Sequence, residues 1–273
     1  MNPASISNCL EDAEYIIHIA GITKAKHKSE FYSGNVTTTK NLLSAANQLK
    51  HLKKFCFISS LTAVGPSVNG IPLTEASPCH PITAYGKSKL EAELACKNFS
   101  DRLPIVIIRP PAVFGPRDTD ILEIFKWVSR GFKPMIGSSA KSLSLVYAPD
   151  LAQGIIRATL DERTTGETYN IADPKIFTFS SIIDYLTTLV HKRTIHVHLP
   201  KGLVYTMAAL AQCASFLSKG PAVLNLEKAR DLLQTHWVSD PRKILEHIGF
   251  QTSTSIYDGV NKTYHWYQDN GWL

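Results

Sequence analysis

A chain of 273 residues, 44% of them hydrophobic, can bury a large core as one domain or as two interleaved ones. The formal net charge of +6 comes from scattered basic residues, which favours an anionic cofactor and argues against a nucleic-acid partner. The five cysteines have no metal-ligand spacing, so the sequence predicts no metal site and a reducing, cytoplasmic location.

Nearly continuous apolar runs alternate with amphipathic segments along the first part of the chain. Such runs indicate strands buried on both faces of a parallel sheet, and the alternation indicates βαβ units. Strands are expected at 15–20, 54–59, 105–108, 143–147 and 168–171. Helices are expected at 35–49, from Thr83 onward, at 119–130 and at 150–160, the last with Asp150 as its N-cap.

Residues 176–273 contain few strand signals, and their expected helices lie at 179–190, 203–217 and 224–233. The sequence therefore predicts an α/β fold. A Rossmann-like parallel sheet with helices on both faces would occupy residues 1–175, and a smaller, mostly helical substrate-binding lobe would occupy 176–273. Residues 116–144 would lie partly in that lobe.

The stretch 203–217 is the most apolar part of the chain, yet it falls short of the ~20 residues that span a bilayer. We expect it to form a core helix or a wall of a substrate pocket, with a peripheral helix at a membrane surface as the alternative. The first 14 residues lack a charged head followed by an apolar run, so no signal peptide is predicted.

Tyr85 and Lys89 lie four residues apart near the start of the helix that Thr83 is expected to cap, so both side chains share one helix face. An ammonium beside the phenol would lower the tyrosine pKa from about 10, and such a tyrosine can transfer a proton at a carbonyl or alcohol centre. Ser60, at the end of the 54–59 strand, would line the same crevice. The alternative is a solvated helix face.

Seven segments in this order resemble the extended short-chain dehydrogenase/reductase superfamily, which includes NAD-dependent epimerases and dehydratases and the 3β-hydroxysteroid dehydrogenases. They lie at 18–21, 35–39, 57–65, 85–89, 109–116, 146–150 and 169–171. The resemblance implies catalytic roles for Ser60, which would hold the substrate oxygen, Tyr85, the general acid/base, and Lys89, which would hold the nicotinamide ribose. Implied contacts to NAD or NADP come from Ala20, Gly21, Asn35, Ser59, Tyr85, Lys89, Pro110, Ala112 and Val113.

Two of the polar residues in these segments have simpler interpretations. Asn35 would order a helix or take part in a proton relay, and a role as helix N-cap is at least as well supported. His18 is expected to be a buried, hydrogen-bonded strand residue and not a catalyst.

The family opens with a strand and a Gly-x-x-Gly-x-x-Gly loop that holds the cofactor pyrophosphate, and this sequence has no such loop. The resemblance therefore predicts an N-terminally truncated, incomplete dinucleotide-binding domain, either a fragment or mis-started reading frame or a natural remnant. We expect weakened dinucleotide binding and an exposed edge on the 15–20 strand. The choice between NAD and NADP is left open, because the selecting residue would precede the sequence.

Two positions distinguish the branches of the superfamily. Nucleotide-sugar epimerases commonly carry Asn where Ala112 stands and an Arg for the substrate diphosphate where Leu143 stands. We therefore expect an NAD(P)-dependent oxidoreductase that acts on the alcohol or ketone of a small hydrophobic substrate, like a hydroxysteroid dehydrogenase or dihydroflavonol reductase. The alternatives are a nucleotide-sugar epimerase/dehydratase and a non-catalytic binding remnant.

A stripe of small residues on the Tyr85 helix bears on oligomeric state. Ala84, Ser88, Ala92 and Ala95 would permit close packing against a second copy, so a homodimer is expected. The competing interpretation is that the stripe packs on the chain's own sheet.

Overall fold

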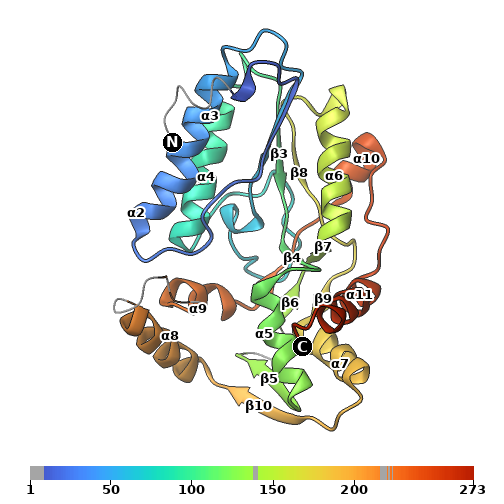
Figure 1. Cartoon of the computed structure of the whole chain (residues 1–273). Helices are drawn as coiled ribbons and strands as arrows, with labels where there is room; N and C mark the ends of the chain where they lie inside the picture. Colours follow the sequence, from blue (N-terminus) through green and yellow to red (C-terminus); the bar gives the residue numbers. More distant parts are fainter. Residues whose placement is uncertain (1–8, 138–140, 216–219, 221, 223) are drawn as a thin grey trace.

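The computed structural model describes residues 9–137, 141–215, 220, 222 and 224–273. Its central sheet has four strands in the order β1-β2-β3-β8, and every neighbouring pair is parallel. The strands are β1 (Tyr15–His18), β2 (Lys54–Ile58), β3 (Ile105–Arg109) and β8 (Thr168–Asn170) (Figure 1). The predicted Rossmann-like parallel sheet is confirmed.

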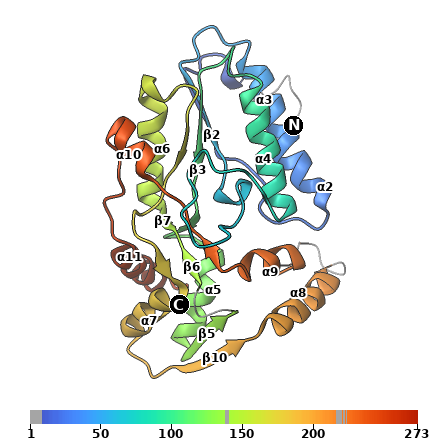
Figure 2. The ribbon, with the colours of Figure 1, turned by 180° about the vertical axis from the view of Figure 1, so that it is seen from behind.

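Helices cover both faces of this sheet (Figures 1 and 2). Because successive strand residues point to opposite faces, Phe55 and Phe57 pack with the helices on one side, and Cys56 and Ile58 pack with those on the other. All of β2 and β3 is buried, which explains their continuous apolarity. The first face is covered by α3 (Thr38–Ala46) and α4 (Ala84–Lys97), and the second by α6 (Ala148–Leu160) and α10 (Arg242–Ile248).

Strand β1 forms an edge of the sheet. It pairs with β2, and among the described residues no strand pairs with its other side. Tyr15 and Ile17 are each 39% exposed, and Ile19 just beyond the strand is 64% exposed. The expected exposed edge is therefore present, and an apolar unpaired edge of this kind is a site at which another strand can add.

The region predicted as a single helix over 35–49 begins earlier and has three parts. A short α2 (Lys28–Phe31) passes into η1 (Tyr32–Thr37), a π-helical turn, and then into α3. Asn35 therefore lies inside the helical run, and its interpretation as an N-cap is wrong. Single π-helical turns within α-helices are found mostly at functional sites.

The second lobe contains more strand than its sequence indicates. The strand expected at 143–147 is present, divided at Ser144 into two short strands. The other strands of the lobe were not predicted, because most of them have only two or three residues and lack the run length that reveals a strand in a sequence. The lobe carries two two-stranded sheets, β4-β7 and β10-β5, and a three-stranded sheet, β11-β6-β9. These strands are β4 (Ala112–Phe114), β5 (Phe132–Ile136), β6 (Ser142–Leu143), β7 (Leu145–Tyr147), β9 (Phe177–Thr178), β10 (Ile195–Leu199) and β11 (His236–Trp237).

The helices of the second lobe match the predicted positions closely. They are α5 (Thr119–Ser129), α7 (Phe179–Val190), α8 (Lys201–Ser215), α9 (Leu226–Leu232) and α11 (Ile256–Asp269). Helix α10, in contrast, returns to the central sheet, where Ile244 packs in the same cluster as Cys56 and Val106. Residues after 176 therefore contribute to both lobes.

Three local expectations are wrong. Helix α6 begins at Ala148, so Asp150 lies within its first turn and accepts a hydrogen bond from the Thr254 N–H at 2.8 Å. The small-residue stripe of α4 is buried inside the chain, because Ala92 and Ala95 pack on the sheet. Helix α8 is mostly peripheral: Val204 and Ala208 pack in a small buried cluster, but of its described residues only these two and Ser215 are buried and none lines the main cavity, while residues 216 and 217 of the expected helix lie outside the described residues.

No described helix is both long and apolar enough to cross a membrane.

Candidate active site

Ser60 lies directly after β2, where the chain turns into η2 (Leu61–Ala63). Its Oγ caps this turn and accepts hydrogen bonds from the Thr62 backbone N–H at 3.2 Å and from Thr62 Oγ1 at 2.9 Å. The hydroxyl is therefore held at the carboxyl end of the sheet, where parallel α/β sheets bind their ligands.

Helix α4 brings Tyr85 to this hydroxyl. Thr83 caps the helix as predicted, and its Oγ1 accepts from the Gly86 N–H at 3.2 Å. A Cβ at position 86 would lie 2.3 Å from the carbonyl oxygen of Thr62, so only glycine allows the first turn of α4 to pack on η2. This close packing brings the phenol of Tyr85 near the hydroxyl of Ser60, close enough for that hydroxyl to influence the tyrosine pKa.

The predicted effect of Lys89 on Tyr85 is wrong. Burial raises the pKa of Tyr85 to about 12, the nearby hydroxyl of Ser60 opposes that rise, and the negative charge of Asp231 adds to it. Lys89 acts elsewhere: its Nζ donates to the Ile58 carbonyl at 2.5 Å and lies 4.4 Å from the ring centroid of Phe57. Tyr85 is consequently a protonated phenol at neutral pH.

Lys89 is 4% exposed, and burial lowers the pKa of its ammonium to about 8. Gly21, in the loop after β1, lies beside it, because a Cβ at position 21 would be 3.9 Å from Lys89 Nζ and 3.0 Å from Asn35 Oδ1. Ala20 precedes it in the same exposed segment. The backbone at position 21 therefore passes directly over the lysine.

Asn35 holds that loop in place from the π-helical turn. Its Oδ1 accepts from the Ile22 N–H at 2.7 Å, and its Nδ2 donates to the Ile22 carbonyl at 3.1 Å and to Ser88 Oγ at 2.9 Å. These three bonds tie the loop after β1 to α4, so Asn35 orders the segment that bears Gly21.

Ser59 points into the core instead of the crevice. Its hydroxyl donates to Glu93, which also receives two hydrogen bonds from Arg109, at 2.9 Å and 2.6 Å. The side chains of Arg109 and Glu93 are 3% and 1% exposed. This buried pair locks α4 to β2 and β3 directly below the site.

His18 is confirmed as a buried strand residue. Its Nε2 lies 2.9 Å from Thr39 Oγ1, and it is 4% exposed. Burial, assisted by the charge of Lys89, lowers its pKa to about 4, so it is neutral at physiological pH.

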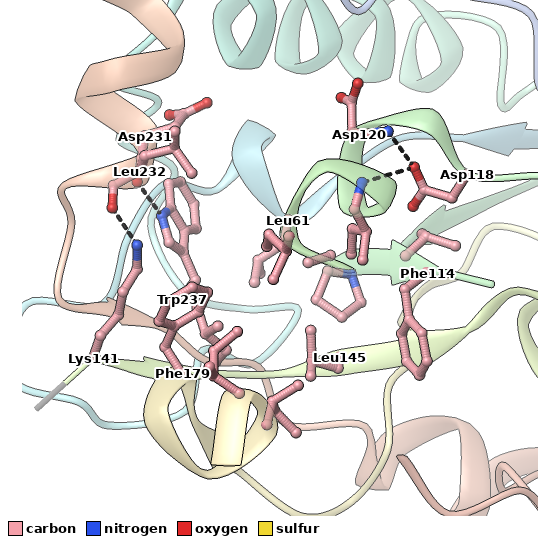
Figure 3. A pocket seen from close by; sticks show the side chains of 18 of the residues that line it. Leu61, Phe114, Asp118, Asp120, Lys141, Leu145, Phe179, Asp231, Leu232 and Trp237 are labelled. Atoms are coloured by element: carbon pink, nitrogen blue, oxygen red, sulfur yellow. Dashed lines mark hydrogen bonds between the residues drawn. The ribbon is translucent and has the colours of Figure 1, made fainter. Parts of the chain in front are cut away.

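A cavity of about 510 Å³ opens from Ser60 into the second lobe. Pro111, Ala112 and Val113, which follow Pro110 after β3, form part of its wall, so the strand ends meet the lobe here. Most of the remaining lining is apolar, and Figure 3 shows Leu61, Phe114, Leu145 and Phe179 around its middle.

Charged groups of the cavity wall gather at two sides (Figure 3). On one side, Lys141 donates to the Leu232 carbonyl, and Trp237 Nε1 donates to the Asp231 carbonyl at 3.0 Å. Burial lowers the pKa of Lys141 to about 8 and raises that of the Asp231 carboxyl to about 7. Among the described residues, Asp231 Oδ1 has no hydrogen-bond partner.

The other side carries Asp118, which caps α5, and Asp120. Asp120 forms ion pairs with Lys24 from the loop after β1 and with Lys228 from α9. Three separate segments are thereby joined at the mouth of the site.

The residues fit the nicotinamide half of a dinucleotide. Lys89 uses one of its three N–H donors on Ile58, which leaves donors for ribose hydroxyls, and the glycine backbone at position 21 permits close approach. The described residues contain no glycine-rich turn leading from a strand into a helix N-terminus, the feature that holds a pyrophosphate. Among the described residues, the part of the cradle that is present is therefore the one that would face the nicotinamide.

Comparison with known proteins agrees with this fold and site. The family model described as the NAD dependent epimerase/dehydratase family matches residues 1–172, and the chain belongs to that family. It is thus one of the extended short-chain dehydrogenases/reductases, a superfamily of NAD(P)-dependent enzymes, as its motifs indicate.

Two curated relatives and one solved structure show the range of the likeness. The uncharacterized protein y4nL of Sinorhizobium fredii is 34% identical over 65% of this chain, and the match spans 51% of that protein's length. The ceramide reductase of Caulobacter vibrioides is 26% identical to this chain, and the match covers 99% of this chain and 79% of the reductase. The UDP-glucuronic acid 4-epimerase of Bacillus cereus, in complex with UDP-glucuronic acid and NAD, has a TM-score of 0.78 at 21% identity and covers 97% of this chain and 78% of its own. At that identity the last likeness concerns the fold.

Sequence reasoning missed several residues that build the site. Gly86 could have been noticed as a glycine in the first turn of a helix, where it costs stability unless close packing requires it. Lys141 and Asp231 carry no motif, and they meet only because α9 folds back over the cavity.

Proposed function

We propose that this chain is an NAD(P)-dependent oxidoreductase that interconverts a ketone and an alcohol on a hydrophobic substrate. The observation that carries the proposal is the cavity, which is apolar along most of its wall and begins at Ser60, whose hydroxyl lies near the phenol of Tyr85. Ala112 and Leu143 both line it, so two positions that would carry polar side chains in a sugar-nucleotide site are apolar here. Ceramide is a lipid, and the likeness to a ceramide reductase over 99% of the chain supports the same substrate class.

Each catalytic residue then has one task in reduction. Ser60 would donate a hydrogen bond to the ketone oxygen, and Tyr85 would transfer its phenol proton to that oxygen as charge develops on it. Lys89 would hold the nicotinamide ribose. When bound, the reduced nicotinamide would supply the hydride. With a pKa of about 12, Tyr85 carries at neutral pH the proton that reduction requires.

A ketone series tests the proposal directly. Purified chain is mixed with NADH or NADPH and with methyl ketones of increasing length, and oxidation of the cofactor is followed by absorbance. Burial of each added methylene should raise kcat/KM about fourfold until the cavity is full. Rates that do not depend on chain length would contradict a hydrophobic substrate.

Nucleotide-sugar epimerisation is the second candidate, and the two lysines of the cavity wall, Lys141 and Lys228, favour it because they could face a diphosphate. Against it, Lys141 is bonded to the Leu232 carbonyl and Lys228 to Asp120. Interconversion of two UDP-sugars with no net cofactor oxidation, in the absence of ketone reduction, would select this candidate. Failure to quench or enhance the fluorescence of either reduced cofactor would instead indicate a binding remnant.

A further inference from the structure

Helix α8 packs on the second lobe through one narrow face. Val204 and Ala208, four residues apart, are buried and contact Ala229 and Leu233 in and just after α9. Both figures of the whole chain show α8 at the periphery, beside α9 (Figures 1 and 2). In this cluster, the buried residues that α8 contributes all belong to one apolar stripe.

A second apolar stripe on α8 faces outward. Leu203, Met207 and Leu210 are spaced four and three residues apart, so they share a helix face about 100° away from Val204 and Ala208. Their exposed fractions are 44%, 41% and 66%. A contiguous row of large exposed apolar side chains marks an interaction site.

The sequence around this stripe is basic and free of acids. No Asp or Glu occurs between Asp184 and Glu227, a stretch that contains Lys192, Arg193, Lys201 and Lys219. Lys192, Arg193 and Lys201 are exposed, and Ile195 between them is 68% exposed. Exposed apolar side chains with basic neighbours along the chain are complementary to a surface that is negative outside and apolar beneath.

We infer that α8 and the segment before it dock on the surface of an anionic lipid bilayer, with Leu203, Met207 and Leu210 inserted at the level of the headgroups. The helix has 15 residues and packs on the lobe through a different face, about 100° around the helix, so it would lie along the surface and not cross it. The exposed cations would contact lipid phosphates.

Docking would also serve the proposed function, on which this part of the inference rests. Helix α9 packs against α8 and forms part of the cavity wall through Lys228, Asp231 and Leu232. A membrane-bound α8 would hold this wall close to the lipid, and a hydrophobic substrate would have a short path out of the bilayer.

Vesicle flotation tests the inference. The full chain is mixed with vesicles of phosphatidylcholine alone or of equal parts phosphatidylcholine and phosphatidylglycerol. We expect it to float with the anionic vesicles, and raising NaCl from about 0.1 M to about 0.5 M should release it in part. The double variant Leu203→Asp/Leu210→Asp should bind more than about tenfold less. Substituting Lys192, Arg193 and Lys201 by Gln should weaken binding roughly fivefold per residue.

The matched control places the same two aspartates on other helices, as Leu94→Asp/Ile156→Asp, where the native residues are 50% and 51% exposed. This control should float like the wild type. Equal loss in both double variants, or no flotation of the wild type, would overturn the inference. So would a wild-type dimer in light scattering that only Leu203→Asp/Leu210→Asp dissociates, because the stripe would then bind a second copy. Reduction of a water-soluble ketone without vesicles would show that the proposed function stands even where docking fails.

Discussion

Two regions meet at Ser60, and they are built in different ways. On one side, Tyr85 and Lys89 stand on α4, a helix of 14 residues packed on strands that are buried throughout. On the other side, the cavity wall combines short strands such as β6 and β7 with α5, α7 and the end of α9. The first region fixes three side chains relative to one another, whereas the second encloses a volume.

This difference suggests a division of tasks, in which the region of Tyr85 and Lys89 carries out the chemistry and the cavity determines substrate preference. The catalytic end depends on close packing, as at Gly86, and on a buried ion pair beneath it. The cavity depends on the size and polarity of many side chains, so single changes there should alter substrate preference and leave proton transfer intact. The predictions below test that division, beginning with the largest expected effect.

Replacing Tyr85 by Phe should lower kcat for ketone reduction by about 10²–10⁴-fold, because the proton donor is lost while the ring remains. The affinity for the reduced cofactor, measured by fluorescence titration, should stay the same. Tyr257→Phe, at a tyrosine that is 38% exposed and does not itself line the cavity, is the control and should keep full activity. Equal activity of the two variants would remove Tyr85 from the mechanism.

Replacing Arg109 by Leu should lower the free energy of unfolding by about 3–5 kcal/mol, because Glu93 is then left buried without its partner. Urea denaturation measures the change. Arg242→Leu removes an ion pair to Asp240 from a side chain that is 75% exposed, and it should leave the urea midpoint unchanged. A stable Arg109→Leu variant would mean that the pair does not hold α4 on the sheet.

The pH dependence of stability should reveal His18. Its pKa is about 4 in the fold and 6.5 in the unfolded chain, so the unfolded state binds the proton first as pH falls. The wild type should therefore lose stability between pH 6.5 and 4, by up to about 3 kcal/mol relative to His18→Gln. Urea midpoints measured across that range test this, and parallel curves for the two proteins would show that His18 is not buried as described.

Replacing Leu143 by Arg should reduce kcat/KM for long-chain ketones by about tenfold, since a charged group would enter the apolar wall. The rate with a short ketone should change little, because Ser60 and Tyr85 are untouched. The ratio of the two rates is the measurement. A similar loss for both ketones would show that cavity and catalytic end are not separable.

The arrangement of Ser60, Tyr85 and Lys89 could be predicted from the sequence because it follows local rules, whereas their catalytic roles stay predictions. Tyr85 and Lys89 share a helix face by spacing alone, and Ser60 follows a run too apolar to be anything but a buried strand. The direction of the Tyr85 pKa shift could not be predicted, since it depends on burial and on Asp231, which lies far away in the sequence. The i, i+4 spacing identifies neighbours along the helix, but it gives no information on how far other segments bury the phenol.

The cavity and the strands of the second lobe could be predicted from the sequence only to a small extent. Strands such as β9, with two residues, have no periodicity to detect, and the fold brings Lys141 to Leu232, 91 positions away along the chain. Helix α8 is an example in which apolar sequence overestimates burial. Its apolarity predicted a buried helix, but only one of its two apolar stripes is buried within the described chain, and the other is exposed.

The measurement that tests the central claim most directly is transfer of deuterium from reduced cofactor labelled at the nicotinamide C4 to a long-chain ketone, followed by mass spectrometry of the product. The account predicts that the wild-type chain yields an alcohol with deuterium on the carbinol carbon, and that Tyr85→Phe yields almost none. Absence of labelled alcohol with either cofactor, from a chain that demonstrably binds that cofactor, would contradict the assignment of Ser60, Tyr85 and Lys89 to ketone reduction.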